Sequence, residues 1–374
     1  MREVVLVAGT RPEAIKIAPL ALELAASDWA RPRVVVTGQH GEVVLNTLGQ
    51  FGLTPSDSLG AGHEGGLPGL AGAVMRGLGE VLSRRPADLV VVQGDTVSAA
   101  AGAYAAFLQG VPVAHLEAGL RTGDLTSPFP EEGNRQLIAR IAAVHLAPTH
   151  RSAAHLVAEG IRPGTVHVTG NTVVDAVRWI AGLRAPFPDG SAARVIAGGR
   201  RIVLVTAHRR ESWGEPIRRV ARAVDTLAAR HGDTDFVVAT HMNPAVREAV
   251  AAELSSRENI HLLGPLPYEV FVRLLSLSTL AITDSGGIQE EAPVFGVPVL
   301  VTRETTERME AVEAGVAALV GTDQDRIVTE AGRLLSDEEA HAAMAQAASP
   351  FGDGTASTAC AAAFHKFLAG RPAV

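Results

Sequence analysis

Three carboxylates in the first half of the chain follow strand-like segments in a way that suits acid–base chemistry. Asp95 comes after the run 88–93, Glu117 follows the run 113–116, and Glu131 begins a helix-competent segment. Continuous apolar runs are typical of buried parallel strands, whose carboxyl ends meet at one edge of a sheet. Repulsion and partial burial would raise the pKa values of carboxylates gathered there, as a general base or acid needs.

A structural interpretation stays open for each carboxylate taken alone. Asp95 or Glu131 could cap a helix N-terminus, and Glu117 could pair with Arg121. Lys16 favours the chemical interpretation, because it lies one turn into the first expected helix, where its ammonium group opposes the helix dipole. We therefore expect an anion beside Lys16.

The segment TDSGGIQEEAP at 283–293 predicts a phosphate site. An apolar strand at 280–282 is followed by Ser285, two glycines and a helix-competent stretch. The free N–H groups and the positive dipole end of such a helix both favour a phosphate. Glu291 lies about two turns further on, within reach of a ribose hydroxyl. The alternative is a tight strand–helix turn with solvated glutamates.

Other familiar functional motifs are either absent or lie outside the strand–helix setting that they require. The match to G-x-G-x-x-G at 60–65 follows a polar loop rather than a strand, so we interpret it as a flexible loop. No Walker A, H-E-x-x-H or C-x-x-C pattern is present, and the 13 histidines are scattered. We predict neither a metal nor a cofactor.

Composition indicates a globular enzyme of two domains. The chain has 374 residues, 47% of them hydrophobic and 20% charged. Its net charge of −7 favours neither nucleic acid nor an anionic membrane as partner. The single Cys360 excludes a disulfide framework. The chain starts with a strand at 4–8, without a signal peptide or membrane-spanning run, and we expect it in the cytoplasm.

Strands and helices alternate along the chain, which predicts an α/β fold with two doubly wound parallel sheets. The order restarts after a loop-like stretch at 185–190, and the chain crosses between the halves near Gly170. A last helix at about 355–368 could pack on either half. The expected helices of the first half are 12–26, 67–82, 96–109 and 131–142. The expected strands are 4–8, 34–37, 88–93, 113–116, 144–147, 202–206, 235–240, 261–263, 280–283 and 298–301.

The chain resembles the non-hydrolysing UDP-N-acetylglucosamine 2-epimerases over nearly its whole length. The matching blocks are GTRPEAIK at 9–16, GQH at 38–40, GDT at 94–96, AHLEAGLRTGD at 114–124, SPFPEEGNRQ at 127–136, GNTVVDA at 170–176, TAHRRES at 206–212, TDSGGIQEEAP at 283–293 and TTER at 305–308. The resemblance implies a glycosyltransferase-B-like fold of two Rossmann-like domains with the active site in their cleft. The expected domains are 1–170 with the returning helix 355–374, and 171–354. A homodimer without nicotinamide or metal is also implied.

The resemblance also assigns roles to residues that match the motifs of the family. The implied catalytic residues are Asp95, Glu117, Glu131 and His208. The implied substrate-binding residues are Arg11, Lys16, Phe271, Ser285, Gly286, Gly287, Glu291 and Arg308. Gln93, which stands where histidine often precedes GDT, departs from the family pattern and touches no implied acid–base group.

The reaction implied is reversible C2 epimerisation of UDP-N-acetylglucosamine to UDP-N-acetylmannosamine. It would proceed by anti-elimination of UDP to 2-acetamidoglucal, because the C2 proton is not acidic enough for direct removal. Three alternatives stay open: a glycosyltransferase of the same fold, a hydrolysing epimerase that releases free N-acetylmannosamine, and a UDP-sugar sensor without activity. The acid–base set argues against the first and the last.

A second UDP-N-acetylglucosamine, bound as an activator, is a further implication of the resemblance. The matching positions are Gln39, Arg76, Glu132, Arg210 and His241. Gly41 stands where relatives commonly have arginine, and glycine loosens the start of the next helix. We therefore expect activation that is weaker than in relatives with the full segment.

Overall fold

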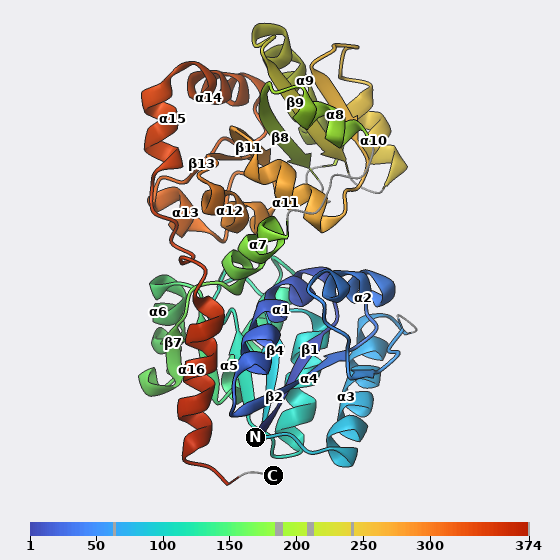
Figure 1. Cartoon of the computed structure of the whole chain (residues 1–374), viewed down its shortest axis with the longest axis vertical. Coiled ribbons are helices and arrows are strands. Elements are labelled where there is room, and N and C mark those ends of the chain that lie inside the picture. Colours follow the sequence, from blue (N-terminus) through green and yellow to red (C-terminus); the bar gives the residue numbers. More distant parts are fainter. Residues whose placement is uncertain (63–64, 184–189, 208–212, 241–242, 373–374) are drawn as a thin grey trace. The chain divides into compact units, whose positions relative to one another are not determined.

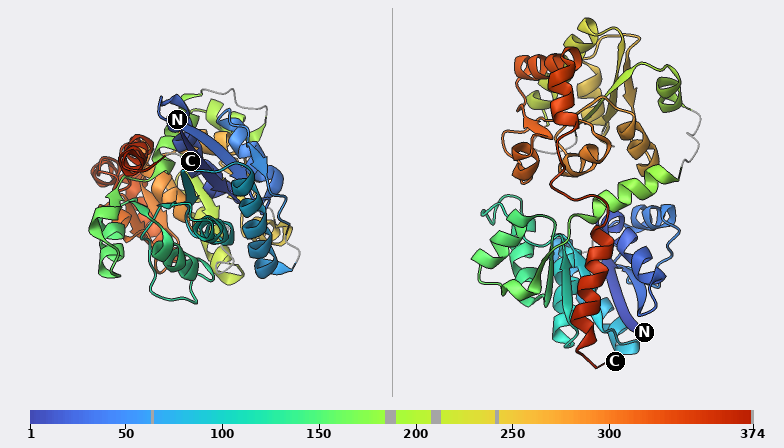
Figure 2. Two further views of the ribbon diagram at one scale, coloured as in Figure 1. Left: turned by 90° about the horizontal axis from the view of Figure 1, so that it is seen from below. Right: turned by 60° about the vertical axis from the view of Figure 1, so that its left-hand side comes forward.

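The chain folds into two compact units, each built on one parallel sheet (Figures 1 and 2). The structure is a computed structural model that describes residues 1–62, 65–183, 190–207, 213–240 and 243–372. The N-terminal unit comprises Met1–Trp179 and Phe351–Val374, and the C-terminal unit comprises Ile180–Pro350. The observed division thus falls inside helix α7 (Thr172–Gly182), close after the crossing expected near Gly170.

The N-terminal sheet has the strand order β3-β2-β1-β4-β5-β6-β7, and all its pairings are parallel. Continuous burial along β1 and β4 follows from their unbroken valine and leucine runs. The order reverses between β1 and β4, and such a switch point is where Rossmann-like sheets bind ligands. The strands are β1 (Arg2–Ala8), β2 (Ala30–Val36), β3 (Asp57–Ser58), β4 (Leu89–Gln93), β5 (Val113–Leu116), β6 (Val144–Ala147) and β7 (Val166–Val168).

Helices cover both faces of this sheet. Apolar side chains of α3, α4 and α5 pack with those of β1 and β4 in one core cluster. On the other side α1 contacts α16, so the C-terminal helix returns to the N-terminal unit (Figure 1). The helices are α1 (Arg11–Ala26), α2 (Gly41–Gln50), α3 (Gly66–Arg84), α4 (Val97–Leu108), α5 (Glu131–Ile141), α6 (His150–Ala158), the 3-10 turn η1 (Pro163–Thr165) and α16 (Ala356–Ala369).

The C-terminal sheet repeats the same topology with the order β10-β9-β8-β11-β12-β13. Its core gathers apolar side chains of β8, β9 and β11 with those of α9 and α14. The strands are β8 (Arg201–Ala207), β9 (Thr234–Thr240), β10 (Ile260–Leu263), β11 (Leu280–Thr283), β12 (Val299–Val301) and β13 (Ala317–Leu319). The helices are α8 (Ser191–Ala197), α9 (Glu215–Arg230), α10 (Pro244–Ala251), α11 (Tyr268–Ser276), α12 (Gly286–Glu291), the 3-10 turn η3 (Ala292–Phe295), α13 (Met309–Glu313), α14 (Gln324–Ser336) and α15 (Glu338–Ala345).

The predicted α/β class with two doubly wound parallel sheets is confirmed. The helices expected in the first half and at the C-terminus are present, with ends that shift by one or two residues. Across the described part of the chain, no helix is both long enough and apolar enough to cross a bilayer.

Candidate active site

The turn after β1 brings the chain very close to α4. A Cβ atom built on Gly9 would lie 2.3 Å from Oγ of Ser98 and 2.7 Å from Oγ1 of Thr37. No real side chain tolerates such contacts, so only glycine fits where β1 passes into α1. The turn thereby sets the position of Arg11, which begins α1 and is half-buried.

Glu13 joins this turn to the turn after β4. Its Oε2 accepts hydrogen bonds from the backbone N–H groups of Gly9 (2.9 Å) and Thr10 (2.6 Å), and its Oε1 accepts one from Oγ1 of Thr96 (2.7 Å). Thr96 in turn caps α4 by accepting from Ala99 N–H. Burial raises the pKa of Glu13 to about 7, although these hydrogen bonds act in the opposite direction.

Glu117 follows β5 and is held by donors from three other elements. One carboxylate oxygen, Oε2, accepts from Nζ of Lys16, from Nε2 of Gln93 (3.1 Å) and from Nδ2 of Asn171 (3.3 Å). The backbone of Glu117 has φ +65°, a left-handed conformation that no other non-glycine residue in the described ranges adopts. Such strain persists only where the surroundings enforce it, and it often marks functional sites.

The anion expected beside Lys16 is therefore the carboxylate of Glu117, and both side chains are buried. Arg121, the alternative partner of Glu117, instead pairs with Glu159 through Nε and Oε1 at 2.6 Å. The alternative in which Glu117 pairs with Arg121 is therefore wrong.

Asp95 is fixed by the start of α5. Its Oδ2 forms an ion pair with Arg135, and its carbonyl oxygen accepts from Nδ2 of Asn134 at 2.8 Å. Thr96, not Asp95, caps α4. The residue preceding α5 is Pro130, so Glu131 is not an N-cap either. Within the part of the chain that the structure describes, the half-buried Glu131 side chain has no hydrogen-bond partner, which leaves its carboxylate open to a ligand.

Glu132, the neighbour of Glu131, is completely buried. It accepts hydrogen bonds from Thr122 N–H (3.0 Å), Gln136 Nε2 (3.0 Å) and, at 3.4 Å, Gly123 N–H. Burial acts to raise its pKa, but these bonds outweigh burial and the pKa is lowered. In the described conformation Glu132 fixes the loop that follows Glu117.

Of the other positions expected to hold an activator, Gln39 and Arg76 belong to the N-terminal unit. Gln39 follows β2, and its Oε1 accepts from Oγ of Ser98 at 2.7 Å. Arg76 is exposed on α3. Arg210 and His241, as well as the expected catalytic His208, lie outside the described residues.

His115 is a site residue that sequence patterns did not reveal. It is fully buried in β5, and its Nε2 lies 2.7 Å from the carbonyl oxygen of Gly94, which precedes Asp95. Burial lowers the pKa of His115 to about 3, so the neutral ring is the form that donates to Gly94. Asn171 and Arg135 were also missed, since only folding brings them to the acidic residues. The expectation that Gln93 touches no implied acid–base group is wrong, because its amide donates to Glu117.

In the C-terminal unit, β11 ends at Thr283 and α12 begins at Gly286 after Ser285. The Oγ1 atom of Thr283 accepts from Ser285 N–H at 2.9 Å, which shapes the turn. A Cβ atom on Gly286 would lie 2.9 Å from the guanidinium carbon of Arg308. The first N–H groups of α12 therefore share a small region with one guanidinium group, a combination suited to a phosphate.

Hydrogen bonds fix Arg308 over this turn. Its Nε donates to Oε1 of Glu290 at 2.9 Å, and its own backbone N–H donates to Oγ1 of Thr306 at 3.2 Å. The Thr306 hydroxyl donates to Gln289, whose amide donates back to the carbonyl of Ser285. The segments 285–290 and 306–308 therefore form one connected site.

A hydrogen bond joins Glu291, the last residue of α12, to the start of α11. Oε1 of the buried Glu291 accepts from the hydroxyl of Tyr268 at 3.2 Å. Tyr268 begins α11, and Phe271 is half-buried one turn further along that helix. The expected ribose and uracil positions thus belong to the same unit as the turn that is expected to bind phosphate.

Comparison with known proteins agrees with this geometry. A family model described as UDP-N-acetylglucosamine 2-epimerase matches residues 22–365. The Escherichia coli K12 UDP-N-acetylglucosamine 2-epimerase is 43% identical over 95% of this chain and 96% of its own length. A Neisseria meningitidis UDP-GlcNAc 2-epimerase, solved with UDP-GlcNAc, is 39% identical with a TM-score of 0.87, over 97% of this chain and 100% of that one.

A third similar structure is the S. aureus MnaA protein solved with UDP. It is 38% identical with a TM-score of 0.90 and covers 100% of this chain and 99% of that chain. The match of folds confirms the glycosyltransferase-B-like pair of Rossmann-like domains that the resemblance implied. The chain belongs to the UDP-N-acetylglucosamine 2-epimerase family.

Proposed function

We propose that this protein interconverts UDP-N-acetylglucosamine and UDP-N-acetylmannosamine without releasing free sugar. The observation that carries the proposal is the carboxylate of Glu117, held on one oxygen by Lys16, Gln93 and Asn171. Such a clamp fixes the direction of a carboxylate, as a proton-transfer group requires. Membership of the family and the relatives solved with UDP-GlcNAc or UDP support the same substrate.

The reaction is an anti-elimination followed by re-addition. A carboxylate takes the C2 proton, the electrons of that C–H bond form a C1=C2 double bond, and the C1–O bond breaks with its electrons leaving on UDP. The intermediate is 2-acetamidoglucal. A proton then adds to C2 from the opposite face while a diphosphate oxygen forms the C1–O bond again, so atoms and charges balance.

Each unit contributes different groups to this scheme. In the N-terminal unit Asp95, Glu117 and Glu131 serve proton transfer at the sugar, and the described pairing gives Lys16 the added task of positioning Glu117. In the C-terminal unit the turn at Ser285 stabilises the negative charge that develops on the departing diphosphate. His208 is proposed to assist proton transfer or diphosphate stabilisation. The remaining substrate-binding residues are Arg11, Phe271, Gly286, Gly287, Glu291 and Arg308.

Incubation of the purified chain with UDP-N-acetylglucosamine tests the proposed activity. Phosphorus and proton NMR should reveal UDP-N-acetylmannosamine, with free N-acetylmannosamine absent at early times. Accumulation of free N-acetylmannosamine and UDP would instead assign a hydrolysing epimerase. Failure of any UDP-sugar conversion, with intact UDP binding, would contradict the enzyme assignment.

We also propose that a second UDP-N-acetylglucosamine activates the reaction. Gln39 and Arg76 lie in the N-terminal unit as described, with polar side chains that suit a nucleotide sugar. Reactions started from pure UDP-N-acetylmannosamine should show a short lag that added UDP-N-acetylglucosamine removes. A long lag with almost no turnover would contradict the weakening attributed to Gly41, and no lag at all would contradict activation.

A homodimer is the third proposal. Four large apolar side chains of α4 and α5 are about half or more exposed: Tyr104 (47%), Phe107 (50%), Leu108 (63%) and Leu137 (65%). The rings of Tyr104 and Phe107 stack with their centroids 6.4 Å apart, which makes a flat apolar surface. Sedimentation equilibrium should give twice the chain mass, and the double variant Phe107→Glu, Leu137→Glu should shift it to the monomer.

A further inference from the structure

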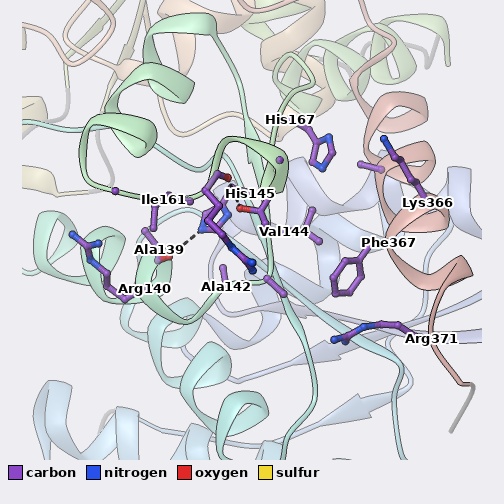
Figure 3. Close-up of a pocket in the computed structure, with 16 residues that line it drawn as sticks. Ala139, Arg140, Ala142, Val144, His145, Ile161, His167, Lys366, Phe367 and Arg371 are labelled. Carbon is purple, nitrogen blue, oxygen red and sulfur yellow. Dashed lines mark hydrogen bonds between the residues drawn. The ribbon is translucent and has the colours of Figure 1, made fainter.

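The N-terminal unit contains a cavity of about 570 Å³ at the amino ends of β6 and β7. Its walls come from the end of α5, the first two residues of β6, the loop 160–165, His167 of β7 and the C-terminal part of α16 (Figure 3). Volumes between about 300 and 1,000 Å³ are typical of small-molecule sites. The cavity is thus large enough for an organic ligand.

Positive charge dominates the lining of this cavity. Arg140, Arg162, Lys366 and Arg371 contribute to it, and none of the described residues that line it carries a carboxylate. Within the described ranges, neither Arg162 nor Lys366 forms an ion pair. Lys366 is one of only two lysines in the sequence. An anion would compensate these charges.

One histidine of the lining, His167, lies near the positive charge of Lys366. Burial is the main cause that lowers the pKa of His167, and the positive charge of Lys366 lowers it further. Figure 3 shows the His167 ring on the same side of the cavity as Lys366. A neutral imidazole beside an ammonium group offers a hydrogen-bonding partner to a phosphate oxygen without adding a further charge.

Apolar groups complete the walls. Val144, Ile161 and the ring of Phe367 face the cavity together with Ala139 of α5 and the alanines at 142, 143 and 363. The guanidinium carbon of Arg371 lies 4.6 Å from the centroid of the Phe367 ring, a cation–π contact. The combination of apolar wall and cationic rim fits a ligand with both an organic part and a phosphate.

The cavity is separate from the proposed acid–base groups. Val144 begins β6 and Val166 begins β7, so the cavity lies at the amino edge of the sheet. Asp95 and Glu117 follow the carboxyl ends of β4 and β5 in the same parallel sheet. A ligand in this cavity therefore belongs to a second site.

We propose that this cavity binds a small molecule bearing a phosphate or diphosphate group, with the phosphate held by Arg162 and Lys366. Guanidinium and ammonium groups are the usual protein partners of phosphate oxygens. A nucleic acid is disfavoured, because the chain carries a net charge of −7 and the cationic groups surround a concavity rather than form a stripe.

Calorimetric titration of the full-length Gly286→Val variant with inorganic pyrophosphate tests the proposal, because this substitution obstructs the proposed diphosphate site and leaves the cavity intact. We expect one pyrophosphate per chain. Lys366→Glu should weaken its binding at least about tenfold, since a charge-assisted contact is lost and reversed. Arg84→Glu, the same charge change at an exposed position of α3, should alter it less than about twofold.

A second variant and a shortened chain extend the test. Arg162→Gln should reproduce the loss if Lys366→Glu does not fold. A chain ending at Pro372 should bind pyrophosphate as the full chain does. Absence of binding up to about 1 mM, equal effects of the Lys366 and Arg84 variants, or binding only by the shortened chain would each overturn the proposal.

Discussion

The ammonium group of Lys16 and the carboxylate of Glu117 form an ion pair between residues 101 positions apart in the sequence. The two side chains are only 8% and 7% exposed. Lys16 belongs to α1, which follows β1, and Glu117 follows the end of β5. The pair therefore connects the helix at the switch point of the sheet to the end of β5. The buried cation directs one carboxylate oxygen, and in the proposed reaction the other oxygen takes part in proton transfer.

Removal of Lys16 alone should destabilise the protein strongly. Lys16→Met leaves Glu117 buried without its cation, which typically costs about 3–5 kcal/mol in the free energy of unfolding. The double variant Lys16→Met, Glu117→Gln should be more stable than Lys16→Met, because no uncompensated charge remains. Urea denaturation measures both, with Arg31→Met at the 59% exposed Arg31 side chain as control. A loss no larger than that of the control would contradict a buried pair.

Glu117→Gln and Glu131→Gln should each lower kcat by roughly 10²–10⁴, the usual contribution of general acid–base catalysis. The dissociation constant of UDP should stay unchanged, because the phosphate-binding turn belongs to the other unit. Steady-state kinetics and calorimetry supply the two values. Glu80→Gln, at an exposed position of α3, is the matched control and should retain full activity. A fully active Glu117→Gln protein would assign that carboxylate a structural role.

Gly286→Val should weaken UDP binding by more than about tenfold while the fold persists. Its Cβ would lie 2.9 Å from the Arg308 guanidinium, so the side chain must displace that group from the first turn of α12. Gly332→Ala, inside α14 of the same unit, meets nothing closer than 3.9 Å and should bind UDP normally. Equal UDP affinities in the two variants would place the diphosphate elsewhere.

Because of Glu13, the free energy of unfolding should fall as pH rises from about 4.5 to about 7. Burial raises its pKa from 4.5 to about 7, so in this window the folded state holds a proton that the unfolded state has released. At about 1.4 kcal/mol per pKa unit the loss is on the order of 3 kcal/mol, complete above pH 7. Glu13→Gln keeps the hydrogen-bonding geometry without the titration.

Urea denaturation of the wild type and Glu13→Gln at pH 5, 6, 7 and 8 checks the sign. The variant should gain stability relative to the wild type as pH rises, whereas Glu42→Gln at an exposed position should track the wild type. A constant difference between Glu13→Gln and the wild type across this range would show that Glu13 has the same pKa folded and unfolded.

Much of the fold could be predicted because buried parallel strands have continuous apolar runs. The runs at β1 and β4 identified the central strands, and Pro12 identified the start of α1. The sequence did not predict β3, β7 and β13, which have only two or three residues and carry too little pattern.

The acidic residues of the site could be proposed from their places after strands, but their partners could not. Arg135 is 40 positions from Asp95, and Asn171 is 54 positions from Glu117. Amide side chains such as Gln93 are common in sequences and carry no motif. Lys16, Gln93 and Asn171 meet at Oε2 of Glu117 only because distant segments of the chain pack together, which the local sequence does not show.

Proton exchange at C2 tests the central claim most directly. The proposed elimination removes the C2 proton of the sugar and returns one from solvent-exchangeable groups. Proton NMR of UDP-N-acetylglucosamine incubated with the protein in deuterated water should therefore show UDP-N-acetylmannosamine with deuterium at C2, without added cofactor. Formation of UDP-N-acetylmannosamine that retains its original C2 hydrogen would contradict the account.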